Sequence, residues 1–410
     1  MPAYNLIVII IVITAVFSYI NFRFIRLPAT IGIMLISLVM SLVIILTGFV
    51  HPGFLGSVTR LVGAIDFNTA LMKVMLGFLL FAGAMHIDIR LLKKEGAAIL
   101  LFSTIGVLIS TFVVGGLMYL ISGWFGLSVD FIYWLLFGAL ISPTDPIAVL
   151  GILRQANIPQ TLEMKITGES LFNDGVGVVV FITIFEIINV GVGNVSASAI
   201  GFLFFKEAGG GLLFGVLTGY LGFWALRPID NYIVELLITL AIVMGGSLLA
   251  DYLHVSGLLA VVVAGIITGN KSMKGMSDLT RDYVKKFWEM VDEVLNAILF
   301  LLIGLEMLVI SMSRTLLVVG CISIFIVLLA RFVSVAVPVV FLRYKKTFEK
   351  NAITILTWGG LRGGISVAMA LSLPRSPFND LFVSITYMIV LFSIIVQGLT
   401  IGRVAKKLIG

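Results

Sequence analysis

Runs of about twenty apolar residues recur along the whole chain, and they constrain its fold more than any other feature. A helix needs ~20 mostly apolar residues to cross the hydrocarbon core of a bilayer. Charged residues make up only 12% of the 410 residues, and the mean hydropathy is +1.18. Soluble domains carry about 25% charged residues. The chain has too little charge to cover a water-facing surface, so the sequence predicts an all-α polytopic membrane protein.

The apolar runs number about thirteen when the chain is divided at charged and turn-forming clusters. They cover residues 4–22, 27–48, 67–87, 96–121, 131–152, 162–188, 198–226, 231–250, 255–270, 289–311, 315–342, 350–373 and 381–402. The run at 198–226 is the weakest, because Lys206, Glu207 and three glycines interrupt it. Continuous runs argue against a membrane β-barrel, whose strands alternate over about ten residues. No basic stretch precedes the first run and no small-residue cleavage site follows it, so a retained helix is expected rather than a signal peptide.

The positions of lysine and arginine predict the orientation. With thirteen spans, most of the 27 basic residues fall in the loops on the same side as the C-terminus. The loops on the other side hold only Arg60, Arg314 and Arg375. Basic residues mark cytoplasmic loops. The N-terminus is therefore expected outside and the C-terminus in the cytoplasm. The net charge of +6 then reflects membrane topology, and no nucleic-acid partner is expected.

Several functional classes lack the residues they need. Cys321 is the single cysteine, and the three histidines are far apart in sequence, so cysteine- and histidine-based metal sites are not expected. Neither a phosphate-binding loop nor a dinucleotide fingerprint occurs, so no nucleotide and no cofactor are predicted. No loop is long enough to hold a soluble domain. A transporter of this kind is expected to run on an ion gradient.

The fifth run contains an acid between two prolines, in Ser142-Pro143-Thr144-Asp145-Pro146. Each proline removes an amide donor and clashes with the preceding turn, so the helix is expected to break. Broken helices at membrane depth line cavities, and their freed carbonyls coordinate ions in secondary transporters. The alternative is a proline kink with Asp145 capping the half-helix. Capping and cation binding are compatible.

The sixth run carries Gly168-Glu169-Ser170-Leu171-Phe172-Asn173-Asp174-Gly175. Ser170 and Asp174 are four residues apart, as are Glu169 and Asn173, so each pair shares a helix face. Carboxylate, hydroxyl and carbonyl oxygens suit hard cations such as Na⁺, Li⁺ or Mg²⁺ rather than soft metals. A single carboxylate that holds either a proton or a cation supplies the competition that an exchanger needs. The alternative is a polar network that only packs the helices.

Two arginines lie in later runs. Arg331 cannot practically deprotonate, so its burial requires an acidic partner, and Glu169 is the best candidate. The alternative is that Arg331 extends to the membrane interface.

Arg362 lies in Gly359-Gly360-Leu361-Arg362-Gly363-Gly364, which predicts a second helix break. Breaks in spans five and twelve are the pattern of an inverted repeat with crossing half-helices, where Arg362 would neutralise helix ends. The alternative is glycine-mediated packing. Other acids in the runs are expected at interfaces; these are Glu186, Glu207, Glu235 and Glu306.

These motifs together resemble those of sodium/proton exchangers. Residues 142–149 resemble the broken-helix signature, and 168–175 resemble the Asn-Asp ion-binding helix. Residues 329–331 and 359–363 match two further segments in order and spacing. The chain is identified as a member of the NhaP-type antiporters in the monovalent cation:proton antiporter-1 family, and the resemblance covers essentially its whole length.

The resemblance implies a homodimer, surrounded by lipid, in the plasma or inner membrane of a prokaryote. A dimerisation domain is expected over 1–88 and 191–312, and a core transport domain over 89–190 and 313–410. The core would move like an elevator. The chain ends soon after the last run, so the regulatory tail of many relatives is not expected.

The resemblance also assigns site residues. The cation is expected at the Thr144 carbonyl, Asp145, Ser170 and Asp174, with Asn173 in support. Glu169 would pair with Arg331. The broken helices would be supported by Pro143, Pro146, Arg362, Gly360 and Gly363. Asparagine at 173 resembles the electroneutral branch, which exchanges one cation for one proton. Na⁺ is the expected cation, with Li⁺ also carried, and a K⁺/H⁺ antiporter is the alternative.

Three other classes remain to be weighed. A cation channel would need a continuous pore, which paired broken helices do not favour. An organic-anion transporter would need a basic pocket, whereas the uncompensated charge at the breaks is acidic. A membrane-embedded enzyme would need a nucleophile and base or a metal-ligand set, and the sequence shows neither. We therefore expect an antiporter rather than an enzyme.

Overall fold

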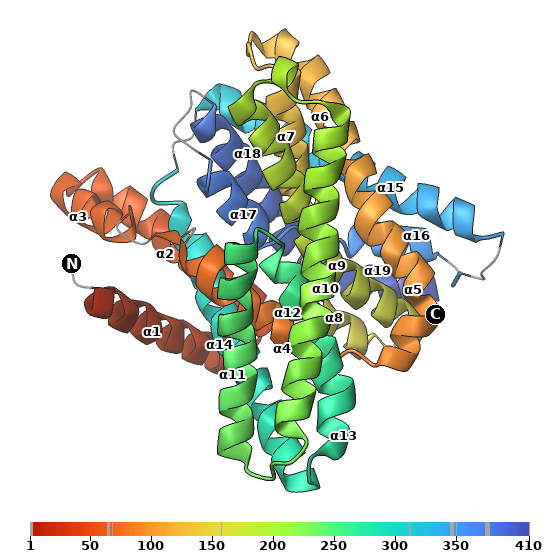
Figure 1. The fold of residues 1–410 in the computed structure, drawn as a ribbon. Coiled ribbons are helices and arrows are strands. Elements are labelled where there is room, and N and C mark those ends of the chain that lie inside the picture. The colour runs from red at the N-terminus through yellow and green to blue at the C-terminus, as the bar shows by residue number, and fades with distance from the viewer. Residues whose placement is uncertain are drawn as a thin grey trace.

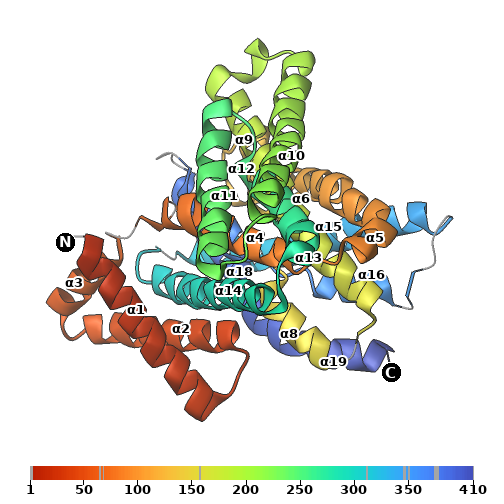
Figure 2. The same cartoon turned by 60° about the horizontal axis from the view of Figure 1, so that its bottom comes forward.

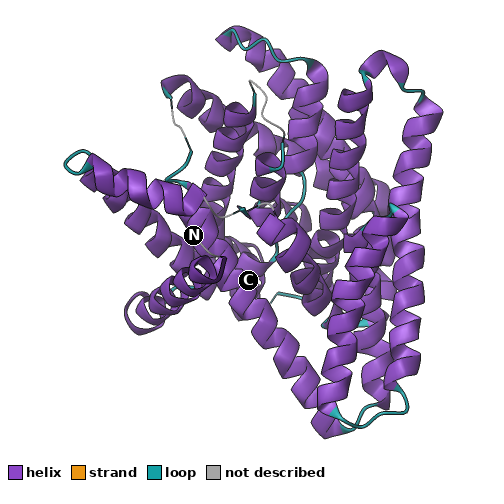
Figure 3. Ribbon diagram, turned by 60° about the vertical axis from the view of Figure 1, so that its left-hand side comes forward, coloured by secondary structure: helices purple, strands orange, loops and turns teal. Residues whose placement is uncertain are grey.

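A computed structural model describes residues 3–63, 66–67, 69–156, 158–310, 313–344, 348–349, 351–373 and 378–409. Within these ranges every regular element is helical, as Figure 3 shows. Eight helices are long and apolar enough to cross a membrane, and three shorter apolar helices lie among them. The predicted all-α membrane fold is confirmed at this level. Four basic residues used in the orientation argument lie outside the described ranges; they are Lys345, Lys346, Lys350 and Arg375.

The N-terminal part forms one group of helices. It contains α1 (Ala3–Ile20), a π-helical turn η1 (Asn21–Ile25), α2 (Ala29–Gly48), α3 (Pro52–Gly63), η2 (Thr69–Met75) and α4 (Leu76–Met85). The helix α3 does not correspond to any apolar run, because its apolar residues occupy one face only. Figure 2 shows α1, α2 and α3 together at one side of the molecule.

The next part contains the first motif-bearing helices. They are α5 (Ile89–Leu101), η3 (Phe102–Gly106), α6 (Val107–Ser122), η4 (Gly123–Phe125), α7 (Phe131–Ile141), α8 (Ile147–Gln155) and α9 (Gln160–Val190). The predicted span 131–152 is broken between α7 and α8, at the two prolines. The 31-residue helix α9 packs against α5 and α7.

The third part of the chain packs against the N-terminal group of helices. It contains η5 (Val192–Asn194), α10 (Ala197–Leu226), α11 (Tyr232–Leu253), α12 (Gly257–Ile267), η6 (Thr268–Ser272), α13 (Met273–Gly275) and α14 (Asp278–Glu306). Helix α12 packs against α4 and α10, and α14 packs against α2 and α4. Capping side chains start several helices; they are Ser196, Asn231, Ser256 and Ser277.

The weakest predicted run is confirmed, whereas the predicted run 289–311 begins later than its helix. The weakest run, 198–226, is the continuous helix α10 (Figure 1). Gly211, Gly215 and Gly219 face α12; a Cβ at Gly211, for example, would lie 2.6 Å from the Ser256 carbonyl oxygen. They permit close packing and do not interrupt the helix. Helix α14 begins at Asp278, eleven residues before the predicted run, because its first turns are amphipathic.

The last part completes the helices around the motifs. It contains α15 (Arg314–Leu342), α16 (Ala352–Trp358), α17 (Gly364–Leu371), α18 (Asn379–Phe392), η7 (Ser393–Gln397) and α19 (Gly398–Ile409). The predicted span 350–373 is broken between α16 and α17, at its glycine cluster. Helix α15 packs against α6, α16 and α18. The fold thus brings both breaks and the acidic face of α9 into one region.

Candidate functional site

The two helix breaks cross each other beside the middle of α9. Residues 142–146 separate α7 from α8, and residues 359–363 separate α16 from α17. The Asp145 amide donates a hydrogen bond of 2.8 Å to the Leu361 carbonyl oxygen. The breaks arise where Pro143 and Pro146 remove helical amide donors and where glycines weaken the helix. They therefore hold each other through the backbone.

Glycines permit this crossing at two positions. A Cβ at Gly363 would lie 2.5 Å from both the Cβ and an Oδ atom of Asp145. A Cβ at Gly360 would overlap the Arg331 guanidinium. Both glycines therefore pack against charged side chains. Glycine-mediated packing does occur here, but the groups that pack against the glycines are the charged side chains of Arg331 and Asp145.

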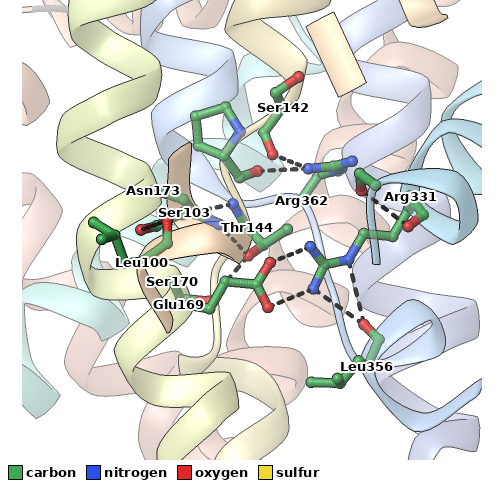
Figure 4. Close-up of polar contacts among 12 residues, drawn as sticks. Leu100, Ser103, Ser142, Thr144, Glu169, Ser170, Asn173, Arg331, Leu356 and Arg362 are labelled. Atoms are coloured by element: carbon green, nitrogen blue, oxygen red, sulfur yellow. Dashed lines mark hydrogen bonds and ion pairs between the residues drawn. The ribbon is translucent and has the colours of Figure 1, made fainter. Parts of the chain in front are cut away.

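Arg362 lies against the end of the other broken helix (Figure 4). Its Nη1 donates to the Ser142 carbonyl and, at 3.0 Å, to the Pro143 carbonyl. Those carbonyls follow α7, where helix carbonyls lack intrahelical partners and carry partial negative charge. Arg362 is 2% exposed. It neutralises the C-terminal end of α7, in the position expected from the sequence.

Asn173 and Ser170 anchor the first break to α9. The Asn173 amide nitrogen donates to the Thr144 hydroxyl at 2.8 Å, and its oxygen accepts from the Thr144 amide at 3.3 Å. The Thr144 and Ser170 hydroxyls are 3.0 Å apart. Both ends of the Asn173 side chain are therefore used to position Thr144. Figure 4 shows these contacts on the α9 side of the break.

Asp174 lies on the same helix with an open acceptor. The side chain is buried, and nothing among the described residues donates a hydrogen bond to its Oδ1. It interacts electrostatically with Asp145. A buried carboxylate oxygen without a donor is costly, so it favours a proton, a cation or water. Two carboxylates with the Ser170 hydroxyl nearby supply hard oxygen ligands for a small monovalent cation.

Glu169 and Arg331 form a buried, two-pronged ion pair. One arginine nitrogen, Nη1, contacts Oε1, and Nη2 donates to Oε2 at 3.0 Å. Arg331 also donates from Nε and Nη2 to the Leu356 carbonyl, at 3.3 and 3.1 Å. Because Arg331 is 7% exposed, the alternative of an interfacial arginine is wrong. The pair ties α9 and α15 to the end of α16.

The structure adds polar residues that the sequence reasoning did not identify. The Arg362 amide donates to the Ser393 hydroxyl at 2.9 Å, and Ser393 donates to Gln397 at 2.7 Å. Gln397 in turn donates to the Trp358 carbonyl at 3.1 Å. These residues brace the second break from η7. In the sequence, the feature that could have identified them is a serine and a glutamine four residues apart in an apolar run.

Two acids expected at interfaces are buried. Glu235 on α11 is 0% exposed and Glu306 on α14 is 8% exposed. Glu186 is exposed and Glu207 is half-buried, as an interfacial position requires. The expectation failed for Glu235 and Glu306 because closeness to a helix end does not determine whether neighbouring helices cover a side chain.

The chain is similar to known proteins over most of its length. The family model described as "Sodium/hydrogen exchanger, transmembrane" matches residues 11–407. The chain is 49% identical to the Na⁺/H⁺ antiporter NhaP of Pseudomonas aeruginosa, over 98% of this chain and 96% of that protein. It is 34% identical to the Na⁺/H⁺ antiporter NhaH of Halobacillus dabanensis, over 83% and 84% of the two chains.

A solved structure shares the fold. It is the sodium proton antiporter MjNhaP1 from Methanocaldococcus jannaschii, with a TM-score of 0.76 and 21% sequence identity. The alignment covers 98% of this chain and 97% of that one. The match to the family model spans both breaks, α9 and α15, which hold the site described above. The chain therefore belongs to the sodium/hydrogen exchanger family of multi-pass membrane proteins.

Proposed function

We propose that the protein is a secondary active antiporter that exchanges Na⁺ for H⁺ at Asp174 and Asp145. The observation that carries the proposal is the open, buried Oδ1 of Asp174 beside two crossing helix breaks. The cation would be held by the Thr144 carbonyl, Asp145, Ser170 and Asp174. Asn173 would position Thr144 without contacting the ion, since both ends of its side chain are already bonded.

The charges around the breaks support a one-for-one exchange. The region of the breaks holds the carboxylates of Asp145, Asp174 and Glu169 and the guanidinium groups of Arg331 and Arg362. This set carries one net negative charge when every member is ionised. A single Na⁺ or a single proton neutralises it, and both together would leave a buried positive charge, which is costly. Competition for Asp174 therefore gives an electroneutral cycle.

Family membership supports Na⁺ as the transported cation. The curated relatives above are named Na⁺/H⁺ antiporters, from two bacteria. Li⁺, which is also small and prefers oxygen ligands, is expected to be carried as well. K⁺ is larger and is the less favoured cation.

We place the protein in the cell membrane of a prokaryote, with the N-terminus outside because most basic loops lie on the same side of the membrane as the C-terminus.

The helix contacts support movement of one domain against another. Helices α5 to α9 pack mainly with one another and with α15 to α19, whereas α2, α4 and α10 to α14 form the other group. We propose that the first group forms the core domain, 89–190 and 313–410, and the second the dimerisation domain, 1–88 and 191–312. Both breaks and α9 belong to the core. An elevator-like movement of the core within a homodimer would expose the bound ion alternately to the two sides.

The test is proton movement in proteoliposomes. The purified protein is reconstituted with a pH-sensitive fluorophore, and Na⁺, Li⁺ or K⁺ is added with and without a potassium–valinomycin clamp. We expect Na⁺ and Li⁺ to drive proton movement that the clamp does not change. Dependence on the clamp would refute the one-for-one stoichiometry. Absence of proton movement with every cation, or single-channel currents, would refute antiport.

A further inference from the structure

One face of α14 carries polar residues in the first two-thirds of the helix. It leads from the N-terminal part of α14 toward the second break. The polar residues are Glu289, Asp292 and Asn296. Leu299 follows them at the same spacing of three or four residues, so all four share this face. The Asn296 amide nitrogen donates to Asp292 Oδ1 at 3.1 Å. One turn earlier, the Glu289 carboxylate lies 3.3 Å from the His86 Nε2 atom.

Asn296 has an acceptor that the protein does not satisfy. The residue is 2% exposed, and its Oδ1 is buried with no donor among the described residues. A buried amide oxygen is normally paired, so an open one indicates a group that the protein itself does not supply. A cation or a bound water fulfils this requirement. Asp292, its hydrogen-bonded neighbour, adds a carboxylate.

Both residues line a cavity between α14 and the N-terminal helices. The cavity has a volume of about 1030 Å³ and lies between α1, η1, the start of α2 and α14. Arg23, Arg26 and Glu293 also line it. Since Arg23 and Arg26 belong to a loop assigned to the cytoplasm by its charge, the cavity lies toward that side.

The same helix face leads to the proposed exchange site. Leu299 lies against α17, because a Cβ at Gly364 would be 2.6 Å from its Cδ1. The preceding residue, Gly363, packs directly on Asp145. Asp292 and Leu299 are seven residues apart, or about 10 Å along a helix. Asp292 also interacts electrostatically with Asp145 and with His86, so it is within range of the site.

We propose that Asp292 and Asn296 form a loading site, where the transported cation binds on its way from the cytoplasmic face to Asp145 and Asp174. The carboxylate of Asp292 and the free Oδ1 of Asn296 would replace part of the hydration shell of the ion. Oxygen ligands of this kind suit Na⁺ and Li⁺. The proposal rests on the cation/proton exchange proposed above, to which it adds a specific access route.

The test measures Na⁺ affinity separately at each membrane face. Everted membrane vesicles expose the cytoplasmic face, and right-side-out vesicles expose the external face, both from cells without other antiporters. In Asp292→Asn we expect the half-saturating Na⁺ concentration at the cytoplasmic face to rise about fivefold or more. The external-face value and the maximal rate should stay within about twofold of the wild type. Asn296→Leu should act in the same direction.

Matched variants separate a loading site from other roles. Asp278→Asn removes the same charge from an exposed position of the same helix, outside the cavity lining, and should leave both affinities unchanged. Asp292→Glu keeps a carboxylate and should restore most of the cytoplasmic affinity. Melting temperatures of all variants identify any that misfold.

Three results would overturn the loading site. They are an unchanged cytoplasmic affinity in both Asp292→Asn and Asn296→Leu, an equal shift at the two faces, or an equal shift in Asp278→Asn. If the wild type itself exchanges no cation for protons, the function proposed above fails. If the wild type exchanges and only the cytoplasmic shift is missing, the loading site alone fails.

Discussion

Asp174 and Glu169 lie five residues apart on one buried helix, but they have different partners. Glu169 is bound at both oxygens by Arg331, whereas Oδ1 of Asp174 has no donor among the described residues. A carboxylate held by a permanent cation is not available to a mobile one. The difference at residue scale therefore assigns ion exchange to Asp174 and structure to Glu169.

The first prediction concerns Asp174. Asp174→Asn keeps the size of the side chain but removes its charge, so the site can hold neither a proton nor Na⁺. We expect proteoliposome exchange to fall by at least about 100-fold, as for loss of a group that acts in every turnover. Glu186→Gln, an exposed acid on the same helix, is the control and should exchange normally. Exchange in Asp174→Asn at more than a tenth of the wild-type rate would refute the assignment.

The second prediction concerns the buried ion pair. Arg331→Ala leaves Glu169 charged and buried, which typically costs about 3–5 kcal/mol of unfolding free energy. Arg331→Ala with Glu169→Gln removes both charges and should regain a large part of the loss. Thermal melts in detergent would measure the cycle. Equal melting temperatures for the wild type and Arg331→Ala would contradict a stabilising pair.

At the scale of single elements, the broken helices depend on what their glycines and prolines exclude. Pro143 and Pro146 interrupt helical hydrogen bonding between α7 and α8, and Gly363 leaves room for the Asp145 side chain. The breaks are stable because other groups satisfy their ends. Arg362 donates hydrogen bonds to the carbonyls of the first break. In the second break, the Ser393 hydroxyl accepts a hydrogen bond from the Arg362 amide.

The third prediction tests this close approach. Gly363→Ala places a methyl group 2.5 Å from Asp145 Cβ and Oδ, so the carboxylate must shift. Overpacking of this kind costs about 1–3 kcal/mol, and we expect exchange to fall by about tenfold or more. Gly151→Ala in α8, where a Cβ would meet nothing within 4 Å, is the matched control. Unchanged exchange in Gly363→Ala would show that the Asp145 position is not critical.

A second set of charges joins the start of α9 to the segment before α16. Lys165 is 2% exposed, and its Nζ lies 2.8 Å from Glu349 Oε2 and 3.6 Å from Glu95 Oε2. Thr161 also donates to Glu349. Burial raises the pKa of the Glu349 carboxyl, but the hydrogen bonds from Lys165 and Thr161 outweigh it. The net pKa lies below the usual value of 4.5.

The fourth prediction follows from this shift. A carboxyl whose pKa is lower in the folded protein stabilises it above pH 4.5, and the contribution is lost as the pH falls through the lowered value. Glu349→Gln should therefore lower the melting temperature at pH 7 and reduce the further fall on acidification below 4.5. Glu163→Gln, whose partner Arg154 is exposed, should change the melting temperature much less. Parallel curves for Glu349→Gln and the wild type from pH 7 to 3 would contradict the prediction.

At the scale of the whole molecule, α4 contacts both of the helix groups. A Cβ at Gly83 would lie 3.7 Å from Leu171 Cδ1 on α9, and one at Gly77 would lie 3.4 Å from Ser247 Oγ on α11. The first contact joins the two proposed domains, whereas the second lies within the dimerisation domain. An elevator movement would separate the first pair and leave the second unchanged.

The fifth prediction uses these two pairs in a Cys321→Ser background. Cross-linking Gly83→Cys to Leu171→Cys should stop exchange, and a reductant should restore it. Cross-linking Gly77→Cys to Ser247→Cys should leave exchange within about twofold of the reduced protein, because no relative movement is blocked. Uptake of ²²Na⁺ by proteoliposomes measures both. Full exchange in the cross-linked first pair would refute movement between α4 and α9.

The sequence by itself determined the membrane class and the positions of the two helix breaks. Those conclusions follow from strong local signals, because a charged group or a proline inside an apolar run has few explanations. Residues 142–146 and 359–363 are both breaks in the structure, and the α9 motif lies beside them. Local signals were weaker for α3, for the start of α14 and for the glycines of α10, where packing decides the outcome.

Only the tertiary structure decided which groups are partners. It shows Asn173 bonded to Thr144 at both ends, Arg362 bonded to the end of α7, and Ser393 and Gln397 bracing the second break. It also shows that Glu235 and Glu306 are buried and that Asn296 keeps an open acceptor. These facts depend on contacts between helices far apart in the chain. Spacing along one helix determines which side chains share a face, but not what lies opposite that face.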